Sequence, residues 1–412
     1  MLDRSGGARG GELSQRDLVP FYLGVLSGPM GSGPVIVLFV VLMDAFGVGR
    51  GALSLAVTAY MIPFATVQLI SGGISDLTSR RSSLLGGFGA FGAATIFAGL
   101  APSFGLFLLA QALQGAANAF TTPLVLATLG DITHGRQLSR AVGLFSTANI
   151  AGFLAAPLVA GFLGGISWRA PYLAVGLYTW AFAAWYWFWF RRHGASVPAR
   201  PRSGSLGADS RRILRALGLT VALLAAISFC YSVATRGASY LFADYLQHRW
   251  GSSVEAAGVI LATFGLGGLL LGPLSGDVIT RIGLYRGAAL SMLGVALSLI
   301  LLALAPSPLA FAGANLLYGV AAVYAWTALN MLVVEAVPAH RGTVSSIFGA
   351  ARFYAMGVAP LWFTPLYQSL GARSIYPISA VFALALLPPL LRLRGHHARV
   401  IPGATADDLA RR

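Results

Sequence analysis

Two arginines, Arg236 and Arg352, lie inside long apolar stretches of the chain, where a charged side chain is costly and marks a functional site by default. Arg352 lies about nine residues into its stretch, or about 14 Å along a helix that rises ~1.5 Å per residue. No acid lies close to it in sequence. An unpaired buried positive charge attracts an anion and repels a cation, so we expect Arg352, and with it Arg236, to contact an anionic substrate. A structural role, with the guanidinium bonded to backbone carbonyls, is the alternative for both.

Polar side chains recur at helical spacing in two other apolar stretches, which places them on shared helix faces. They could line a cavity, or they could serve as hydrogen bonds between helices. We take as further substrate-binding candidates Gln111, Gln114, Asn118, Asn149, Asn315, Tyr318 and Trp326.

Residues for other chemistry are absent from the sequence. The single cysteine, Cys230, can form neither a disulfide framework nor a thiol metal site. The histidines fall in predicted loops and tails without metal-ligand spacing, and no phosphate-binding G-x-x-x-x-G-K-[ST] loop occurs. We therefore predict no enzyme, no metal and no cofactor.

The elements that hold these residues are predicted to be membrane helices. Hydrophobic residues make up 57% of the 412 residues, charged residues only 10%, and the mean hydropathy is +0.75. Soluble proteins carry about a quarter charged residues. Because a spanning helix needs about 20 apolar residues, we predict an all-α membrane protein with twelve spans, at 18–43, 53–75, 82–101, 105–130, 140–164, 169–190, 214–246, 255–275, 286–305, 308–335, 343–367 and 373–392. The first span contains SGPMGSGP at 27–34 and is expected to be kinked or broken.

The loop charges predict the orientation. All 28 basic residues are arginines; 22 lie on the side that holds both termini, and four, Arg50, Arg169, Arg249 and Arg373, lie on the other. The positive-inside rule makes the first side cytoplasmic, so the formal charge of +15 reports topology rather than nucleic-acid binding. We expect a monomer in a bacterial inner membrane, divided into a tail at 1–17, six-helix bundles at 18–190 and 214–392, a linker at 191–213 and a tail at 393–412.

The two halves of the sequence resemble each other. Asp76 matches Asp277 and Arg80 matches Arg281 at a shift of 201 residues, and Gly115 matches Gly319 at a shift of 204. Such a duplicated six-span unit allows two bundles to rock about a shared site at the bilayer midplane.

The loop after the second span carries the pattern G-x-x-x-D-x-x-x-R-R, with Gly72, Asp76, Arg80 and Arg81. This pattern resembles the major facilitator superfamily, and the resemblance extends over nearly the whole chain. It implies a twelve-helix transporter with two pseudo-symmetric bundles. It also implies that these four residues form a conformational latch, with Asp277 and Arg281 as a weaker counterpart.

A second resemblance, in the fifth span, is to the antiporter motif G-x8-G-x3-G-P-x2-G-G of the drug:proton branch. The matching residues are Gly143, Gly152, Pro157 and Gly161, with alanine at two glycine positions. Ordinary packing of small residues would also produce such a run. The fourth span departs from the family pattern R-x-x-Q-G, because Gln111 stands where the family has an arginine implicated in proton coupling.

These features predict a secondary transporter that moves a small organic solute by alternating access. Proton-coupled efflux is the family expectation, although no acid is securely at mid-membrane; import of an organic anion is the alternative. A receptor or membrane enzyme would need added signalling structure or catalytic groups that the sequence lacks. The sequence leaves open the substrate, the direction and the coupling ion.

Overall fold

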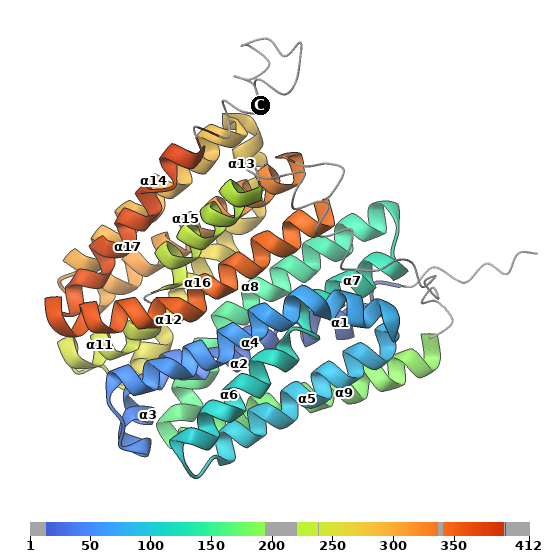
Figure 1. Cartoon of the computed structure of the whole chain (residues 1–412), viewed down its shortest axis with the longest axis horizontal. Coiled ribbons are helices and arrows are strands. Elements are labelled where there is room, and N and C mark those ends of the chain that lie inside the picture. The colour runs from blue at the N-terminus through green and yellow to red at the C-terminus, as the bar shows by residue number, and fades with distance from the viewer. Residues whose placement is uncertain (1–13, 194–220, 238, 337–340, 391, 393–412) are drawn as a thin grey trace, which may run out of the picture.

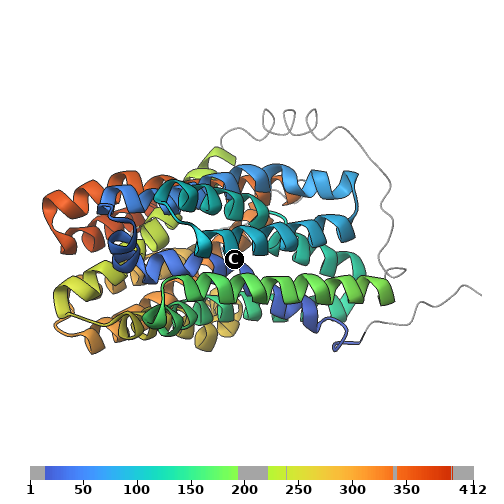
Figure 2. The ribbon, with the colours of Figure 1, turned by 90° about the horizontal axis from the view of Figure 1, so that it is seen from below.

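The computed structural model describes residues 14–193, 221–237, 239–336, 341–390 and 392, and within these residues every regular element is a helix. Residues 194–213 of the predicted linker and the greater part of both predicted tails lie outside the described residues, whereas residues 191–193 form the end of a helix. The helices of the first and second halves of the chain gather on opposite sides of the molecule and share roughly one direction (Figures 1 and 2).

Helices cover all six spans predicted in the first half. Their bounds are α1 Val19–Gly24, α2 Ser27–Val37, α3 Phe39–Phe46, α4 Arg50–Leu77, α5 Arg80–Leu100, α6 Phe104–Asn118, α7 Thr122–Ile132, α8 Gly135–Ile166 and α9 Arg169–His193. The first span is broken as expected, but the break lies at Leu38, where the helix axis turns by 66°, whereas residues 27–34 are continuous helix in α2. Pro34 within α2 supplies no backbone N–H, which weakens the helix just before that turn.

The second half has the same order of helices. Residues 221–232 are helical and continue into a π-helical turn, η2 Val233–Gly237. After it come η3 Ser239–Leu241, α11 Phe242–Trp250, α12 Val254–Leu271, η4 Gly272–Leu274, α13 Ser275–Ile282, α14 Leu284–Leu304, α15 Pro308–Ala336, α16 Arg341–Leu370, η6 Ala372–Ser374 and α17 Ile375–Leu384.

Eight helical stretches of the described chain are long and apolar enough to span a membrane, and a ninth results if the bent pair in the first span is joined. The other predicted spans are also helical. α6 and α7 share one span as shorter helices of 15 and 11 residues, and α9 and α16 occupy the spans at 169–190 and 343–367.

The internal repeat is visible in the backbone packing. Gly115 of α6 lies so close to the carbonyl of Tyr60 in α4 that a Cβ atom there would overlap it, and Gly319 of α15 meets the carbonyl of Phe264 in α12 in the same way. Both glycines and both carbonyls are related by 204 residues. The same close approach therefore fixes the fourth span against the second, and the tenth against the eighth.

Two pairs of helices form the boundary between the halves. α4 packs along α16, and α8 packs along α12; the α4–α16 pair can be followed in Figure 1. At the α8–α12 boundary Gly161 faces Gly258, and a Cβ at Gly258 would lie 2.5 Å from the carbonyl oxygen of Pro157. The absence of side chains lets the helices approach closely.

Candidate functional site

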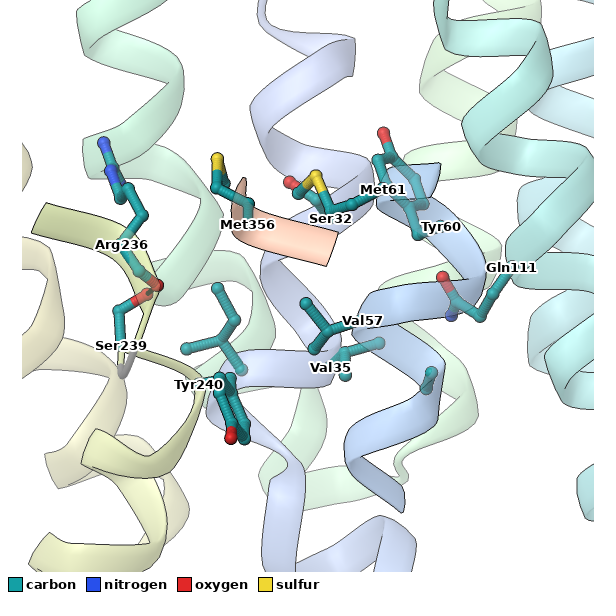
Figure 3. A pocket seen from close by; sticks show the side chains of 12 residues that line it. Ser32, Val35, Val57, Tyr60, Met61, Gln111, Arg236, Ser239, Tyr240 and Met356 are labelled. Carbon is teal, nitrogen blue, oxygen red and sulfur yellow. Dashed lines mark hydrogen bonds between the residues drawn. The ribbon is translucent and has the colours of Figure 1, made fainter. Parts of the chain in front are cut away.

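A cavity lies between the two halves, where both π-helical and proline-containing segments interrupt the regular helices. It has two adjoining, partly open lobes, with about 400 and 700 Å³ of empty space when the open solvent at their mouths is included. Both are lined by Ser32, Ile36, Met61, Arg236, Ser239 and Met356. Arg236 and Gln111 lie on opposite sides of the smaller lobe (Figure 3). The wall is largely apolar with a few polar groups, as is usual for sites that bind small organic molecules.

The π-helical turn that carries Arg236 is stabilised from a neighbouring helix. A π turn disturbs the regular bonding of backbone carbonyls. The hydroxyl of Tyr318 in α15 donates to the carbonyl oxygens of Ala234 and Thr235, the first at 3.1 Å. Tyr318 is itself buried and lines the larger lobe. The π turn therefore replaces a regular α-helical turn and holds Arg236 at the cavity wall.

Arg236 lies between two aromatic rings that belong to different halves of the molecule. Its Cζ atom is 4.3 Å from the ring centroid of Phe153 in α8 and 4.4 Å from that of Phe264 in α12. Such contacts favour a partly desolvated guanidinium but leave its charge uncompensated. No carboxylate among the described residues forms an ion pair with it.

Arg352 lies nearby in α16 but is not among the residues that line the cavity. Its Cζ atom is 4.2 Å from the ring centroid of Trp326, and its Nε atom is buried without a hydrogen-bond partner in the described chain. Trp326 in turn stacks against Tyr231 and Phe348, at ring-centroid distances of 5.7 and 5.5 Å. Two guanidinium groups thus lie in one aromatic region between the halves.

The other predicted binding residues differ in their surroundings. Gln111 lines the smaller lobe, and its buried amide forms no hydrogen bond of normal geometry, although the Tyr172 hydroxyl is close. Asn315 lines the larger lobe, but its amide already donates to the carbonyls of Ile260 and Leu261. The Asn315 amide is therefore already bonded to its own half, whereas the Gln111 amide has the Tyr172 hydroxyl as its neighbour.

Gln114, Asn118 and Asn149 lie outside the cavity lining. The Gln114 amide donates to Thr95 at 2.8 Å and to the carbonyl of Gly31 at 3.2 Å. Asn118 donates to the Tyr60 hydroxyl at 2.9 Å. Asn149 is half-buried in α8. The amides of Gln114 and Asn118 thus form hydrogen bonds between helices of the first half. Such bonds were the alternative to a substrate-binding role.

Several lining residues were not singled out from the sequence. They are apolar or weakly polar and include Ser32, Tyr60, Met61, Phe153, Ser239, Tyr240, Phe264 and Met356. Two signals were available in the sequence: Phe153 directly follows Gly152 of the fifth-span motif, and Ser32 lies within the segment SGPMGSGP of the first span. Phe264 corresponds to Tyr60 in the internal repeat, and both line the cavity.

The predicted latch residues are distributed over the cytoplasmic ends expected for α4, α5 and α13. Arg80 Nε donates to Asp131 at 2.9 Å, and its Nη1 donates to Ser75 at 2.8 Å. Arg81 lies over the Trp187 ring at 4.9 Å. Gly72 and Asp76 belong to α4, but their side chains lie outside the described residues. Asp277 and Arg281 are exposed on α13 and form no ion pair within the described chain.

The fifth-span motif lies at two helix interfaces. Gly152 packs on Pro29 of α2, where an added Cβ would be 3.0 Å from the proline ring, and Gly161 packs on Gly258 of α12. Pro157 lines the larger lobe, whereas Gly143 faces open space. Three of the four motif residues thus support contacts around the cavity.

The fold and the central cavity are those of a membrane transporter, and the family comparison agrees. The model of the Major Facilitator Superfamily matches residues 21–235 and 224–409. The chain therefore belongs to this superfamily; it is a multi-pass membrane transporter and not an enzyme.

Individual relatives and structures are consistent with this membership. The MFS-type transporter YceJ of Bacillus subtilis (strain 168) is 26% identical over 333 residues, which cover 80% of this chain and 83% of YceJ. The lincomycin resistance protein of Streptomyces lincolnensis is 33% identical over 136 residues, which cover 32% of this chain and 27% of that protein. The crystal structure of a D-xylose-proton symporter aligns with a TM-score of 0.75 at 16% identity, over 91% of this chain and 96% of the symporter.

Proposed function

We propose that this transporter exports a small organic anion with an apolar body, in exchange for protons, across a bacterial inner membrane. Arg236 carries the proposal: it lines the cavity, lies between Phe153 and Phe264, and has no ion-pair partner in the described chain. A carboxylate, phosphate or sulfonate would compensate its charge, and the apolar wall would accept the rest of the molecule.

Alternating access follows from this position. Because the two aromatic rings around Arg236 come from α8 and α12, any movement of one half against the other changes its surroundings. A bound anion would lower the barrier between the two arrangements if it compensates the charge more strongly in the state between them than in either arrangement. Arg352 behind Trp326 adds to the positive potential and is proposed as a secondary contact.

The proposal that the protein exports its substrate by antiport rests on its similarity to other transporters. The fifth-span motif and the partial likeness to the lincomycin resistance protein favour export, and the cytoplasmic position proposed for both termini follows from the arginine count. We further propose that the protein acts as a monomer, with bundles at 18–190 and 214–392 and with the latch residues Gly72, Asp76, Arg80, Arg81, Asp277 and Arg281 at the cytoplasmic end. Import of an organic anion with protons is the second candidate, because the cavity itself favours neither direction.

Flux through purified protein in proteoliposomes tests the proposal. With an imposed pH gradient, organic carboxylates, phosphates and sulfonates should move, and lipophilic cations should not. Arg236→Gln should reduce anion flux by at least about tenfold, the equivalent of one charge-assisted hydrogen bond worth about 1.4 kcal/mol or more. The matched control is Arg249→Gln, which removes an exposed arginine from α11 and should leave flux unchanged.

The results separate the alternatives. Anion movement against the proton gradient indicates antiport, and movement with it indicates symport. Transport of cations or neutral drugs by both the wild type and Arg236→Gln would refute the anion proposal and leave the two arginines as structural residues.

A further inference from the structure

The smaller lobe of the cavity has a polar group on each of two opposite sides and an apolar middle. Arg236 of the second half lies on one side and Gln111 of the first half on the other, and the side chains of Val35 and Val57 lie between them (Figure 3). Among the described residues that line this lobe, Arg236 alone carries a charge. A molecule that crosses the lobe therefore meets a cation, then an apolar wall, then a neutral amide.

The surroundings of Gln111 hold its amide at the edge of the lobe. Gln111 lies in α6, and its side chain is completely buried. Its polar neighbour is the hydroxyl of Tyr172 in α9. The Tyr172 ring packs edge-on against Phe107 and Trp168, at ring-centroid distances of 5.7 and 6.5 Å. Such aromatic packing fixes the direction from which the Tyr172 hydroxyl can approach the amide.

One hydroxyl cannot satisfy this amide. A glutamine side chain has two N–H donors and a carbonyl oxygen with two lone pairs, whereas a hydroxyl has a single donor. Within the described chain neither Nε2 nor Oε1 of Gln111 forms a hydrogen bond of normal geometry. Buried polar groups ordinarily have a partner. Because Tyr172 can pair with only one end of the amide at a time, the other end remains for a molecule in the cavity.

The apolar wall decides which chemical group suits Gln111. A carboxylate or an ammonium group placed here would meet only a neutral amide, and removing a charge from water without a counter-charge is costly. A hydroxyl, carbonyl or amide group exchanges its hydrogen bonds with water for hydrogen bonds with Gln111, which is favourable on balance. A purely apolar end would bury the amide without a partner, which costs free energy as well.

We propose that the substrate is a monoanion whose charged group binds Arg236 and whose far end carries a neutral hydrogen-bonding group that binds Gln111. An apolar segment joins the two ends and lies against the wall between them. The inference rests on the proposed function, because it takes Arg236 as the anion site. It adds that dianions and zwitterions are rejected, and it makes Gln111 the residue that selects among monoanions.

Binding of matched compounds to the purified protein tests the proposal. Isothermal titration calorimetry in lipid nanodiscs, at neutral pH, compares straight-chain carboxylates and sulfonates with their ω-hydroxy, ω-amide, ω-carboxy and ω-ammonium derivatives over a series of chain lengths. The wild type should bind the ω-hydroxy and ω-amide compounds about three- to tenfold more tightly than the unsubstituted ones, the equivalent of one hydrogen bond. The ω-carboxy and ω-ammonium compounds should bind more weakly than the unsubstituted ones.

Exchange of Gln111 should change this order in a direction set by the new side chain. Gln111→Leu removes the amide, so the advantage of the ω-hydroxy and ω-amide compounds should disappear, while the unsubstituted compounds bind at least as tightly as before. Gln111→Arg should favour the ω-carboxy compounds, and Gln111→Glu the ω-ammonium compounds. A newly gained preference cannot result from misfolding, so any one of these variants that folds gives a result. The matched control is Gln368→Leu at an exposed position of α16, which should leave the order unchanged.

The outcomes separate this inference from the proposed function. Equal affinities of the wild type for the unsubstituted and ω-hydroxy compounds would overturn the inference, and so would a preference that survives in Gln111→Leu. If binding in those cases is still lost in Arg236→Gln, the proposed anion site stands and only the role of Gln111 is refuted. If neither carboxylates nor sulfonates bind, or if Arg236→Gln binds them as the wild type does, both proposals are overturned.

Discussion

Two ion pairs of the described residues use the same residue types but connect different parts of the molecule. Arg80 and Asp131 belong to one half, and both side chains are only 9% exposed. Arg50 and Asp244 belong to different halves, with the arginine 28% exposed and the aspartate fully buried. A contact within one half persists while the halves move as units, whereas a contact between them must break during alternating access. The first pair is therefore placed to stabilise the fold, and the second to stabilise one arrangement of the halves.

Loss of Arg80 should have the largest effect on stability. Arg80→Ala removes the counter-charge of nearly buried Asp131 and the bond to Ser75, so we expect a stability loss of about 3 kcal/mol. Thermal unfolding of the purified protein in detergent, followed by tryptophan fluorescence, measures this loss. Arg50→Ala should cost distinctly less, because water can reach Asp244 once the halves part. Equal losses in the two variants would mean that both pairs serve the fold alone.

Glycine substitutions at close helix contacts test the same difference between contacts within one half and contacts between the halves. Gly115→Ala forces a Cβ atom into the Tyr60 carbonyl within the first half, and overpacking of this kind costs about 2 kcal/mol. Gly258→Ala forces a Cβ atom into the carbonyl of Pro157 across the boundary, which the halves can relieve by moving apart. We therefore expect Gly115→Ala to lower the unfolding temperature, and Gly258→Ala to alter the distances between spin labels attached to the two halves. Gly143→Ala, which enters open space, is the matched control for both measurements.

The smallest expected effect concerns a single hydrogen bond between the halves. Thr58 of α4 donates to the carbonyl of Gly357 in α16 at 2.7 Å. Thr58→Val preserves the side-chain shape but removes the donor, and such bonds in membrane proteins contribute about 0.6 kcal/mol. Folded yield should not change, and the ratio of molecules with the two halves closed at this contact to molecules with them open should fall by about threefold. Thr95→Val, which removes a comparable hydroxyl from inside the first half, should leave that ratio unchanged.

The helices and their order could be predicted because the lengths of the apolar stretches and the internal repeat can be read directly from the sequence. The matched glycines Gly115 and Gly319 even correspond to equivalent backbone contacts. The sequence drew attention to both intramembrane arginines and placed Arg352 first, but of the two only Arg236 lines the cavity, and the binding role of each stays a prediction.

Side-chain surroundings could not be predicted in the same way. Gln111 and Gln114 lie three residues apart on one helix face, yet only Gln111 lines the cavity. The Gln114 amide donates to Thr95 and Gly31 instead. Which amide finds a partner depends on the neighbouring helices, and these are distant in sequence. His248 was expected in a loop and instead lies in α11, where Gly251 with a φ of 62° ends the helix three residues later. Asp244 was placed near a helix end, but its burial depends on α4 and α16, which are distant in sequence.

The π turn at Val233–Gly237 has a consequence for how this protein is compared with its relatives. A π turn contains one residue more than the α-helical turn it replaces, so it shifts the angular phase of everything that follows by about 100°. Residues of α11 that would continue one face of the helix 221–232 by regular α-helical spacing therefore point in another direction. A relative whose helix is regular here would need a one-residue gap near Arg236 if the positions on either side are to be matched.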